Sequence, residues 1–225
     1  MKAFDAAATS VGRGVQSATA RLAAASLLLA NRQPAAALAE ARRALDEAGG
    51  VGGQPIQSLN LMSVAQARLG HAAEAAKAAA DLVGQTKLIP GPGLRQIEFL
   101  NAGLLALERH ETAKAVEQLT QADKLVPSGP SGAVIFWFPM GEAFLAARDD
   151  AEAAKRFEHI VGAGVDRTAN PVEFVRSLYY LGQISERQGQ RDKALAFYRR
   201  FVEHWGDGDI DRERVADARK KLTGS

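Results

Sequence analysis

The sequence contains no cysteine, and this absence excludes three kinds of chemistry at once. Disulfide bonds, thiol nucleophiles and thiolate metal sites all require a cysteine sulfur. Aromatic residues are also scarce, at 6% of the 225 residues, and the formal net charge is only +2. A chain so close to electrical balance gives no reason to expect a nucleic acid or an anionic membrane surface as its partner.

Long apolar segments are missing as well. The longest apolar run, "LAAASLLLA" from Leu22 to Ala30, is far shorter than the roughly 20 residues that a transmembrane helix needs. The residues after Met1 do not form the apolar core of a secretory signal. We therefore expect a soluble, cytoplasmic protein without membrane insertion if the chain is complete, and the location stays open if the chain is an excised part of a longer protein.

The residue in clear excess is alanine, which has the highest helix propensity and lets helix backbones approach closely. Glycine and proline gather at regular intervals. Between these breaks lie pairs of stretches with apolar residues at helical spacing, each pair divided by a short polar turn. The pattern predicts one all-α domain, 1–225, an α-α superhelix of about five helical hairpins at 16–48, 55–84, 94–126, 132–162 and 170–205, closed by a capping helix at 209–223.

The five hairpins share a register. A small residue in the first helix precedes an alanine of the second by twelve positions, in the pairs Ala25 and Ala37, Ser63 and Ala75, Gly103 and Ala115, Gly141 and Ala153, and Gly182 and Ala194. Small residues are expected where two helix backbones cross, because larger side chains would hold them apart. Four positions after each alanine comes a residue that would fill the gap toward the following helix: Ala41, Ala79, Leu119, Phe157 and Tyr198.

The predicted capping helix has one narrow apolar stripe, formed by Val215, Ala218 and Leu222. Asp209 or Asp211 would cap its N-terminus. Its basic residues, Arg214 among them, are expected largely in solvent. A terminal helix with a polar outer face is what stacked repeats need to cover their last apolar surface.

This pattern resembles the tetratricopeptide repeat (TPR). In that family the first helix carries an aromatic residue, Leu-Gly and Tyr, and the second carries Ala, an aromatic residue and Pro. The spacing is matched by Trp137, Gly141, Phe144, Ala153 and Phe157, and again by Leu178, Leu181, Gly182, Ala194 and Tyr198. The resemblance implies a non-enzymatic module that binds a protein or peptide partner, and it leaves a homodimer open.

The closing segment, Ala194 to Leu222, also resembles the TPR regions appended to bacterial eukaryotic-type serine/threonine kinases. The catalytic motifs of a kinase are absent from the sequence, which has no His-Arg-Asp and no Asp-Phe-Gly. This resemblance gives a second hypothesis, in which the chain is the sensing, regulatory or dimerisation arm of a bacterial signalling protein.

No catalytic or metal-binding constellation emerges from the sequence. The four histidines lack the spacing of a zinc site. The segment Asp207 to Glu213 departs from a calcium loop, because its sixth position is Arg212 and its twelfth would be Ala218. The glycine clusters lack a Walker lysine and the spacing of a dinucleotide-binding loop. We therefore expect no cofactor, no metal and no enzyme activity.

In TPR proteins the first helices line a concave side, and residues flanking the small position contact an extended peptide. Carried onto this sequence, the resemblance implies a peptide-binding groove formed by Asn60, Arg68, Leu104, Phe138, Glu142, Arg176, Tyr179, Gln183 and Arg187. Phe138 and Tyr179 would anchor the partner, and the arginines would orient its acidic or polar groups. The alternative for these residues, favoured for Leu104, is packing between adjacent first helices.

Overall fold

The computed structural model describes residues 15–50, 52–89, 94–126, 134–164 and 169–224, and the regular elements among them are all α-helices. The predicted all-α fold of helical hairpins is confirmed. The chain divides into two compact units, Met1–Leu125 (unit 1) and Val126–Ser225 (unit 2). The predicted start of the fourth hairpin, at 132, lies outside the described residues.

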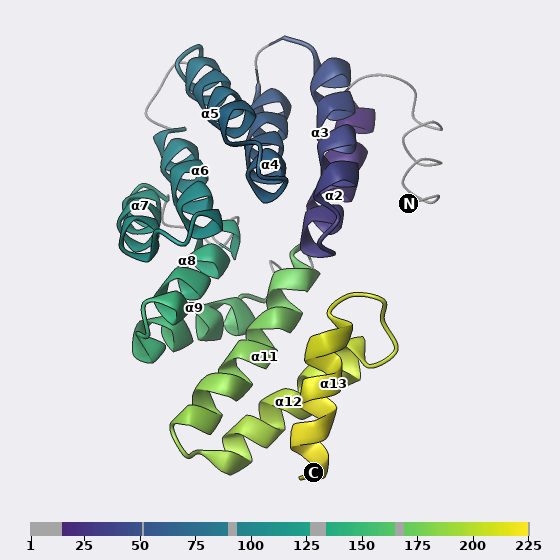
Figure 1. Ribbon diagram of the computed structural model, residues 1–225, viewed down its shortest axis with the longest axis vertical. Helices are drawn as coiled ribbons and strands as arrows, with labels where there is room; N and C mark the ends of the chain where they lie inside the picture. The colour runs from purple at the N-terminus through teal and green to yellow at the C-terminus, as the bar shows by residue number, and fades with distance from the viewer. Residues whose placement is uncertain (1–14, 51, 90–93, 127–133, 165–168, 225) are drawn as a thin grey trace. The chain divides into compact units, whose positions relative to one another are not determined.

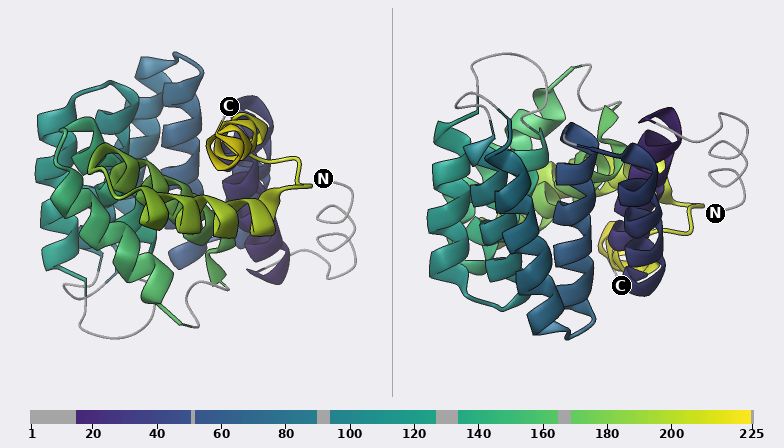
Figure 2. Two further views of the ribbon diagram at one scale, coloured as in Figure 1. Left: turned by 90° about the horizontal axis from the view of Figure 1, so that it is seen from below. Right: turned by 90° about the horizontal axis from the view of Figure 1, so that it is seen from above.

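Unit 1 is built from pairs of helices joined by tight turns (Figure 1). Its hairpins are α2 (Val15–Ala30) with α3 (Pro34–Ala48), α4 (Gly53–Arg68) with α5 (Ala72–Thr86), and α6 (Arg95–Glu108) with α7 (Thr112–Lys124). The first helices also contact one another, α2 with α4 and α4 with α6. Their axes run side by side within the unit (Figure 2).

Unit 2 follows the same plan and ends in a single helix. Its hairpins are α8 (Val134–Ala146) with α9 (Asp150–Gly162) and α11 (Pro171–Arg187) with α12 (Arg191–Trp205). The last helix, α13 (Arg212–Thr223), packs against α12. The predicted capping helix therefore forms, but it begins at Arg212 because Asp211 has a left-handed backbone, with φ 55°.

Every turn inside a hairpin has the same backbone conformation. The residue five positions before the shared alanine has a positive φ in each hairpin, at Arg32, Gly70, His110, Arg148 and Gly189. The N–H of the next residue donates to a carbonyl five residues earlier, as in Gln33 to Leu28 and Asp149 to Phe144. These are Schellman motifs, which satisfy the last carbonyls of the first helix. The repeat thus fixes a left-handed position even where the residue is not glycine.

The predicted register of small and filling residues is visible in the packing. A Cβ atom placed on Gly141 would lie 2.6 Å from the Phe157 ring, and one on Gly182 would lie 2.6 Å from the Tyr198 ring. Each ring therefore lies directly on the glycine of its own hairpin. Phe157 also stacks on Tyr180 of the following hairpin, with ring centroids 5.0 Å apart, so it fills the gap toward that helix as well.

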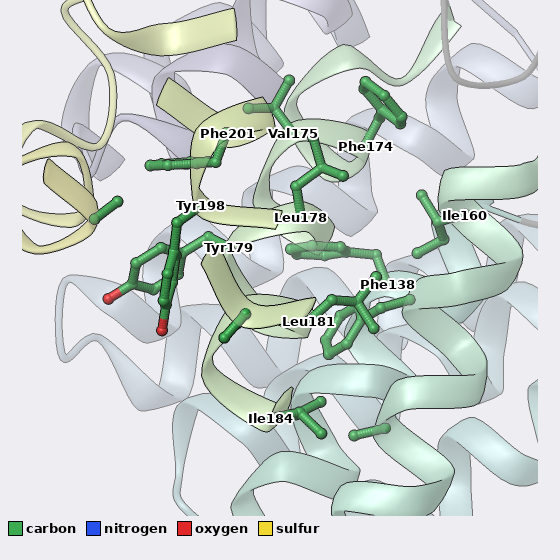
Figure 3. Close-up of a cluster of buried hydrophobic side chains, with 14 of the residues drawn as sticks. Phe138, Ile160, Phe174, Val175, Leu178, Tyr179, Leu181, Ile184, Tyr198 and Phe201 are labelled. Atoms are coloured by element: carbon green, nitrogen blue, oxygen red, sulfur yellow. The ribbon is translucent and has the colours of Figure 1, made fainter. Parts of the chain in front are cut away.

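The core of unit 2 is aromatic (Figure 3). The Tyr179 ring contacts the rings of Tyr198 and Phe201, with centroids 5.9 and 5.2 Å away. Val215 and Ala218 of α13 are buried in the same cluster. The last helix therefore contributes to the core of unit 2, as a capping helix should.

Two expectations for the last helix need correction. Asp211 stands at the N-cap position, but its carboxylate makes no capping hydrogen bond. Its side chain is instead almost fully buried and pairs with Arg176 and Arg214. Arg214 was expected in solvent, yet it is half-buried and lies over the Tyr180 ring, 5.5 Å from the centroid. The two arginines compete with the helix terminus for the aspartate, and a carboxylate gains more from charged donors than from backbone N–H groups.

Candidate binding surface

Asn60 and Leu104, on the first helices of unit 1, both lie at contacts between neighbouring hairpins. The Asn60 Oδ1 atom accepts a hydrogen bond of 2.8 Å from Nδ2 of Asn101, which is itself buried in α6. The same nitrogen donates to Ser63 Oγ at 2.5 Å. Leu104 is half-buried against the cluster that contains Leu28. These two positions therefore hold α4, α6 and the first hairpin together.

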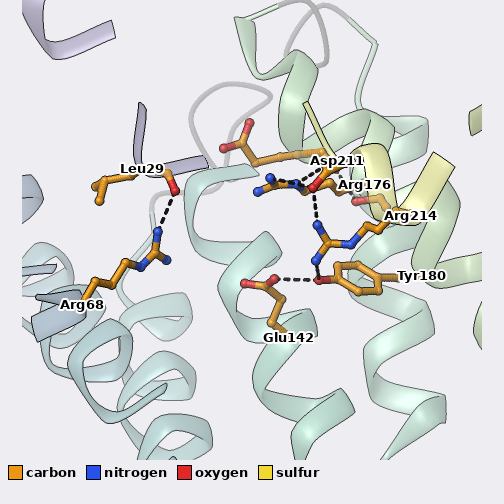
Figure 4. A network of polar contacts seen from close by, with 9 residues as sticks. Leu29, Arg68, Glu142, Arg176, Tyr180, Asp211 and Arg214 are labelled. Carbon is orange, nitrogen blue, oxygen red and sulfur yellow. Dashed lines mark hydrogen bonds and ion pairs between the residues drawn. The ribbon is translucent and has the colours of Figure 1, made fainter. Parts of the chain in front are cut away.

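Arg68 links all three hairpins of unit 1. Its Nη1 atom donates to the backbone carbonyl of Leu29, at the end of α2, at 2.8 Å (Figure 4). Its Nε and Nη2 atoms lie 2.8 Å from Oε1 of Glu108, at the end of α6. The side chain is still 34% exposed. Arg68 thus satisfies a carbonyl at the C-terminus of one helix while part of its guanidinium faces solvent.

Phe138 and Glu142, on α8, both contact Tyr180 of α11. The Phe138 ring is buried and lies 6.1 Å from the Tyr180 ring, between centroids. The Tyr180 hydroxyl donates to Oε1 of Glu142 at 2.9 Å. Burial raises the pKa of Tyr180, and the neighbouring charge of Glu142 raises it further. The phenol therefore stays protonated and acts as a donor.

Arg176 forms an enclosed ion pair in unit 2. Its Nε and Nη2 atoms donate to the two carboxylate oxygens of Asp211 at 2.7 and 3.0 Å (Figure 4). The Arg176 side chain is 13% exposed and that of Asp211 is 5% exposed. Arg214 donates to the same carboxylate and, at 3.0 Å, to the Tyr180 hydroxyl. Two arginines and one aspartate thus join α11 to the start of α13.

Tyr179 and Gln183 belong to a second contact with the same helix. The Tyr179 hydroxyl donates to Oδ2 of Asp217 at 2.8 Å, and Gln183 Nε2 donates to that hydroxyl at 3.0 Å. Burial raises the pKa of Tyr179, and the hydrogen bond to Asp217 raises it further. A phenol held in this way is a poor nucleophile and a stable hydrogen-bond donor.

Arg187 forms a more exposed ion pair at the end of α11. It donates to both oxygens of Asp150 at 2.7 Å each, and its side chain remains 45% exposed. The hydrogen bond from Arg187 holds the pKa of Asp150 below its ordinary value. The pair connects the end of α11 to the first residue of α9.

A small cavity of about 390 Å³ opens beside these contacts, where the α11–α12 turn meets the end of α13. Its lining includes Arg191, Lys220, Lys221 and Glu186. Lys221 donates to Glu186 at 2.6 Å, and this hydrogen bond lowers the pKa of that carboxyl. The cavity adjoins the α13 contacts and has a predominantly basic rim.

Sequence reasoning did not identify the α13 side of these contacts. Asp211, Asp217 and Lys221 pair with residues 35, 38 and 35 positions earlier in the chain. In unit 1, Asn60 and Asn101 are 41 positions apart. A search for complementary polar residues at about one repeat length would therefore have found these partners.

The described residues offer no group of three or more His, Asp or Glu side chains that could hold a metal ion. Among these same residues, no helix combines the length and the apolar character that crossing a bilayer requires. The first helices carry arginines together with half-buried amide and carboxylate groups, which are hydrogen-bonding groups.

Repeated helical hairpins, three of them with a filling side chain lying directly on a glycine, define an α-solenoid of the tetratricopeptide-repeat type. A similar solved structure is that of TTC0263, a thermophilic TPR protein of Thermus thermophilus. It superposes with a TM-score of 0.62 over 92% of this chain and 99% of that chain, at 16% sequence identity. No protein-family model matches the sequence, and no curated protein matches it either. The likeness therefore lies in the fold.

Proposed function

We propose that this chain is a non-enzymatic interaction module that binds a protein or peptide partner along its first helices. The observation that carries the proposal is the TPR-type fold, in which the first helices of each unit lie against one another, α2, α4 and α6 in unit 1 and α8 and α11 in unit 2. A row of neighbouring helices presents side chains at regular spacing, which suits an extended or helical segment of a partner.

The nine proposed contact residues differ in how a partner could reach them. Arg68 and Arg187 are accessible, so we assign them the first contacts with acidic groups of the partner. Five of the residues are half-buried and would contact the partner after these arginines do: Asn60, Leu104, Glu142, Arg176 and Gln183. Phe138 and Tyr179 are buried, so they would act as anchors only after their neighbours move.

The test is capture of partners from cells of the source organism, with the parent and with Arg68→Gln and Arg187→Gln variants. Arg42→Gln is the matched control, because Arg42 is exposed on the second helix α3. We expect at least one captured protein to be depleted several-fold by Arg68→Gln or Arg187→Gln and to be unaffected by Arg42→Gln. Equal capture by all variants would contradict binding along the first helices.

The second candidate function is a sensing, regulatory or dimerisation arm of a bacterial signalling protein such as a serine/threonine kinase. The resemblance of the segment Ala194–Leu222 to kinase-appended TPR regions favours it. Light scattering across a range of protein concentrations separates the two candidates, because a dimerisation arm should form a homodimer on its own. A monomer at every concentration would disfavour a dimerisation role.

A further inference from the structure

The last helix occupies the face of α11 to which the partner was assigned. Arg176, Tyr179 and Gln183 belong to the proposed groove, and the first two bind Asp211 and Asp217 of the α13 segment. Tyr180 and Glu186, on the same side of α11, bind Arg214 and Lys221. Residues i, i+3, i+4, i+7 and i+10 share one face of a helix, so these contacts cover a single continuous strip.

The order of the contacts shows that α13 runs parallel to α11. Residues 176, 179 and 186 pair with residues 211, 217 and 221 in the same order. Successive first helices of unit 1 are related in the same way, since Asn60 pairs with Asn101 and Arg68 with Glu108. The last helix therefore takes the place that the first helix of another hairpin would take.

The contact between α13 and the rest of unit 2 contains several hydrogen bonds and ion pairs and few buried apolar residues. Only Val215 and Ala218 of α13 are buried, whereas α12 buries Ala194, Tyr198 and Phe201. When α13 leaves, both partners of each hydrogen bond or enclosed ion pair regain their hydration, so opening these contacts costs little net free energy, whereas exposing buried rings costs the full apolar burial. An element with few buried apolar contacts opens before the rest of its domain does. The connection from Gly206 to Asp211 contains no helix and leaves room for such a movement.

We propose that α13 is an internal occupant of the α11–α12 face, and that this face takes an amphipathic helix of a partner, with acidic residues at its beginning, when α13 leaves it. The inference rests on the proposed function, because both place the partner on first helices. The partner helix would carry one carboxylate at its N-terminus for Arg176 and a second, six residues later, for the Tyr179 hydroxyl, as Asp211 and Asp217 do. Small aliphatic residues four and seven positions after the first carboxylate would cover the rings, as Val215 and Ala218 do.

Charge explains why the occupant must be acidic at its beginning. The α11 face presents Arg176 near the start of the strip and Glu186 near its end. A helix with acidic groups first and a lysine last is complementary to this strip when it lies parallel to α11, and a helix in the opposite direction is not. While α13 is tethered, its effective concentration is about millimolar, so a partner competes only poorly until α13 is released.

The test uses the full chain and a synthetic peptide of residues 209–224 as the probe. Ala218→Glu places a charge at a fully buried position and should displace α13, whereas Ala216→Glu changes an exposed residue of the same helix. Fluorescence anisotropy should show the labelled peptide binding the Ala218→Glu chain at least tenfold more tightly than the parent or the Ala216→Glu chain. A peptide with both Asp211→Asn and Asp217→Asn should bind at least fivefold more weakly than the unmodified peptide.

Hydrogen exchange on the parent protein gives a second measurement that does not depend on any variant folding. Amides of 212–223 should exchange at least tenfold faster than those in the middle of α12. Exchange of α13 at the same rate as α12 would overturn the inference, because the helix would then not open separately. Equal peptide binding by the Ala218→Glu and Ala216→Glu chains, with helix content retained in both, would also overturn the inference. Neither result bears on capture through Arg68, so the proposed function would stand or fall independently.

Discussion

The early hairpins of unit 1 and the hairpins of unit 2 use one register and fill it in opposite ways. In α2–α3 and α4–α5, a small residue of the first helix stands sixteen positions before another small residue, Ala25 before Ala41 and Ser63 before Ala79. In unit 2, Gly141 and Gly182 stand at the same spacing before Phe157 and Tyr198, whose rings lie on them. The cores differ in the same way: in unit 1 the core is aliphatic around Leu28 and Leu82, and in unit 2 it is aromatic around Tyr179.

This difference shows that the repeat accepts different residue types at the filling position. Two small side chains let helix backbones come close, whereas a ring that lies on a glycine fills the space between two helices from one side. The third hairpin of unit 1 is intermediate in the size of its filling residue, because its Gly103 faces the aliphatic Leu119. The hairpins should therefore be interconvertible by paired substitution, and single substitutions should fail in a predictable direction.

The largest effect is expected from removing a ring that lies on a glycine. Phe157 is fully buried, and Phe157→Ala should lower the free energy of unfolding by about 3–5 kcal/mol, since it loses apolar burial and leaves a cavity. Urea denaturation followed by far-UV circular dichroism measures this loss. A cost below about 1 kcal/mol would show that the ring is not part of the core.

A double-mutant cycle tests whether a hairpin of unit 2 can accept two small residues at these positions, as the first two hairpins of unit 1 do. Gly141→Ala alone should destabilise the parent, because its Cβ would lie 2.6 Å from the Phe157 ring. In the Phe157→Ala background the same change should stabilise by about 0.5–1 kcal/mol, through the higher helix propensity of alanine. If Gly141→Ala changes the free energy of unfolding in the same direction in both backgrounds, the proposed exchange between the two kinds of hairpin is wrong.

Overpacking at the shared alanine comes next in size. Ala153→Leu and Ala194→Leu should each cost on the order of 1–3 kcal/mol, because both alanines are buried where the helices of their hairpins pack. Ala151→Leu and Ala196→Leu, at exposed positions of the same helices, are the controls and should stay within about 0.5 kcal/mol of the parent. If buried and exposed variants melt alike, the register assigned to the hairpins is wrong.

The two bidentate ion pairs of unit 2 allow a smaller comparison. Arg176→Gln should cost about 1.5–3 kcal/mol, because it leaves the enclosed Asp211 without its main partner. Arg187→Gln should cost less than about 1 kcal/mol, because its pair with Asp150 is exposed and screened by salt. Raising the salt concentration should reduce the destabilisation by Arg187→Gln more than the destabilisation by Arg176→Gln.

The pH dependence of the Arg187 effect follows from the pKa of Asp150. Its folded-state pKa is depressed by the hydrogen bond from Arg187, so the stabilisation is present above the unfolded pKa of about 4 and is lost as the pH falls through the lower folded value. The difference between parent and Arg187→Gln should therefore shrink in acid. A difference that stays constant down to strongly acidic pH would mean that the pair contributes nothing through its charge.

The sequence was sufficient for the hairpins and insufficient for the contacts between them. Glycine breaks, helical periodicity and the twelve-residue spacing depend on residues close together in the chain, and they located each helix pair. The pairing of Tyr179 with Asp217 depends instead on how one hairpin is laid against the next element, across 38 residues. Residues that look free on a helical projection, such as Arg176, can therefore already have partners. The domain organisation and the groove stay predictions.

The smallest expected effects lie in the hairpin turns, where both units contain a glycine and a non-glycine residue at the same left-handed position. His110 in unit 1 and Arg148 in unit 2 have φ of 58° and 63°, a conformation that side chains with a Cβ adopt at a cost. His110→Gly and Arg148→Gly should therefore stabilise by about 0.5–1 kcal/mol, after the greater freedom of glycine in the unfolded chain is deducted. Gly70→Ala and Gly189→Ala, at the equivalent turns, should destabilise by about 1 kcal/mol. Thermal unfolding of the four variants and the parent measures each change in stability. A change in the same direction for all four variants would contradict a shared turn geometry.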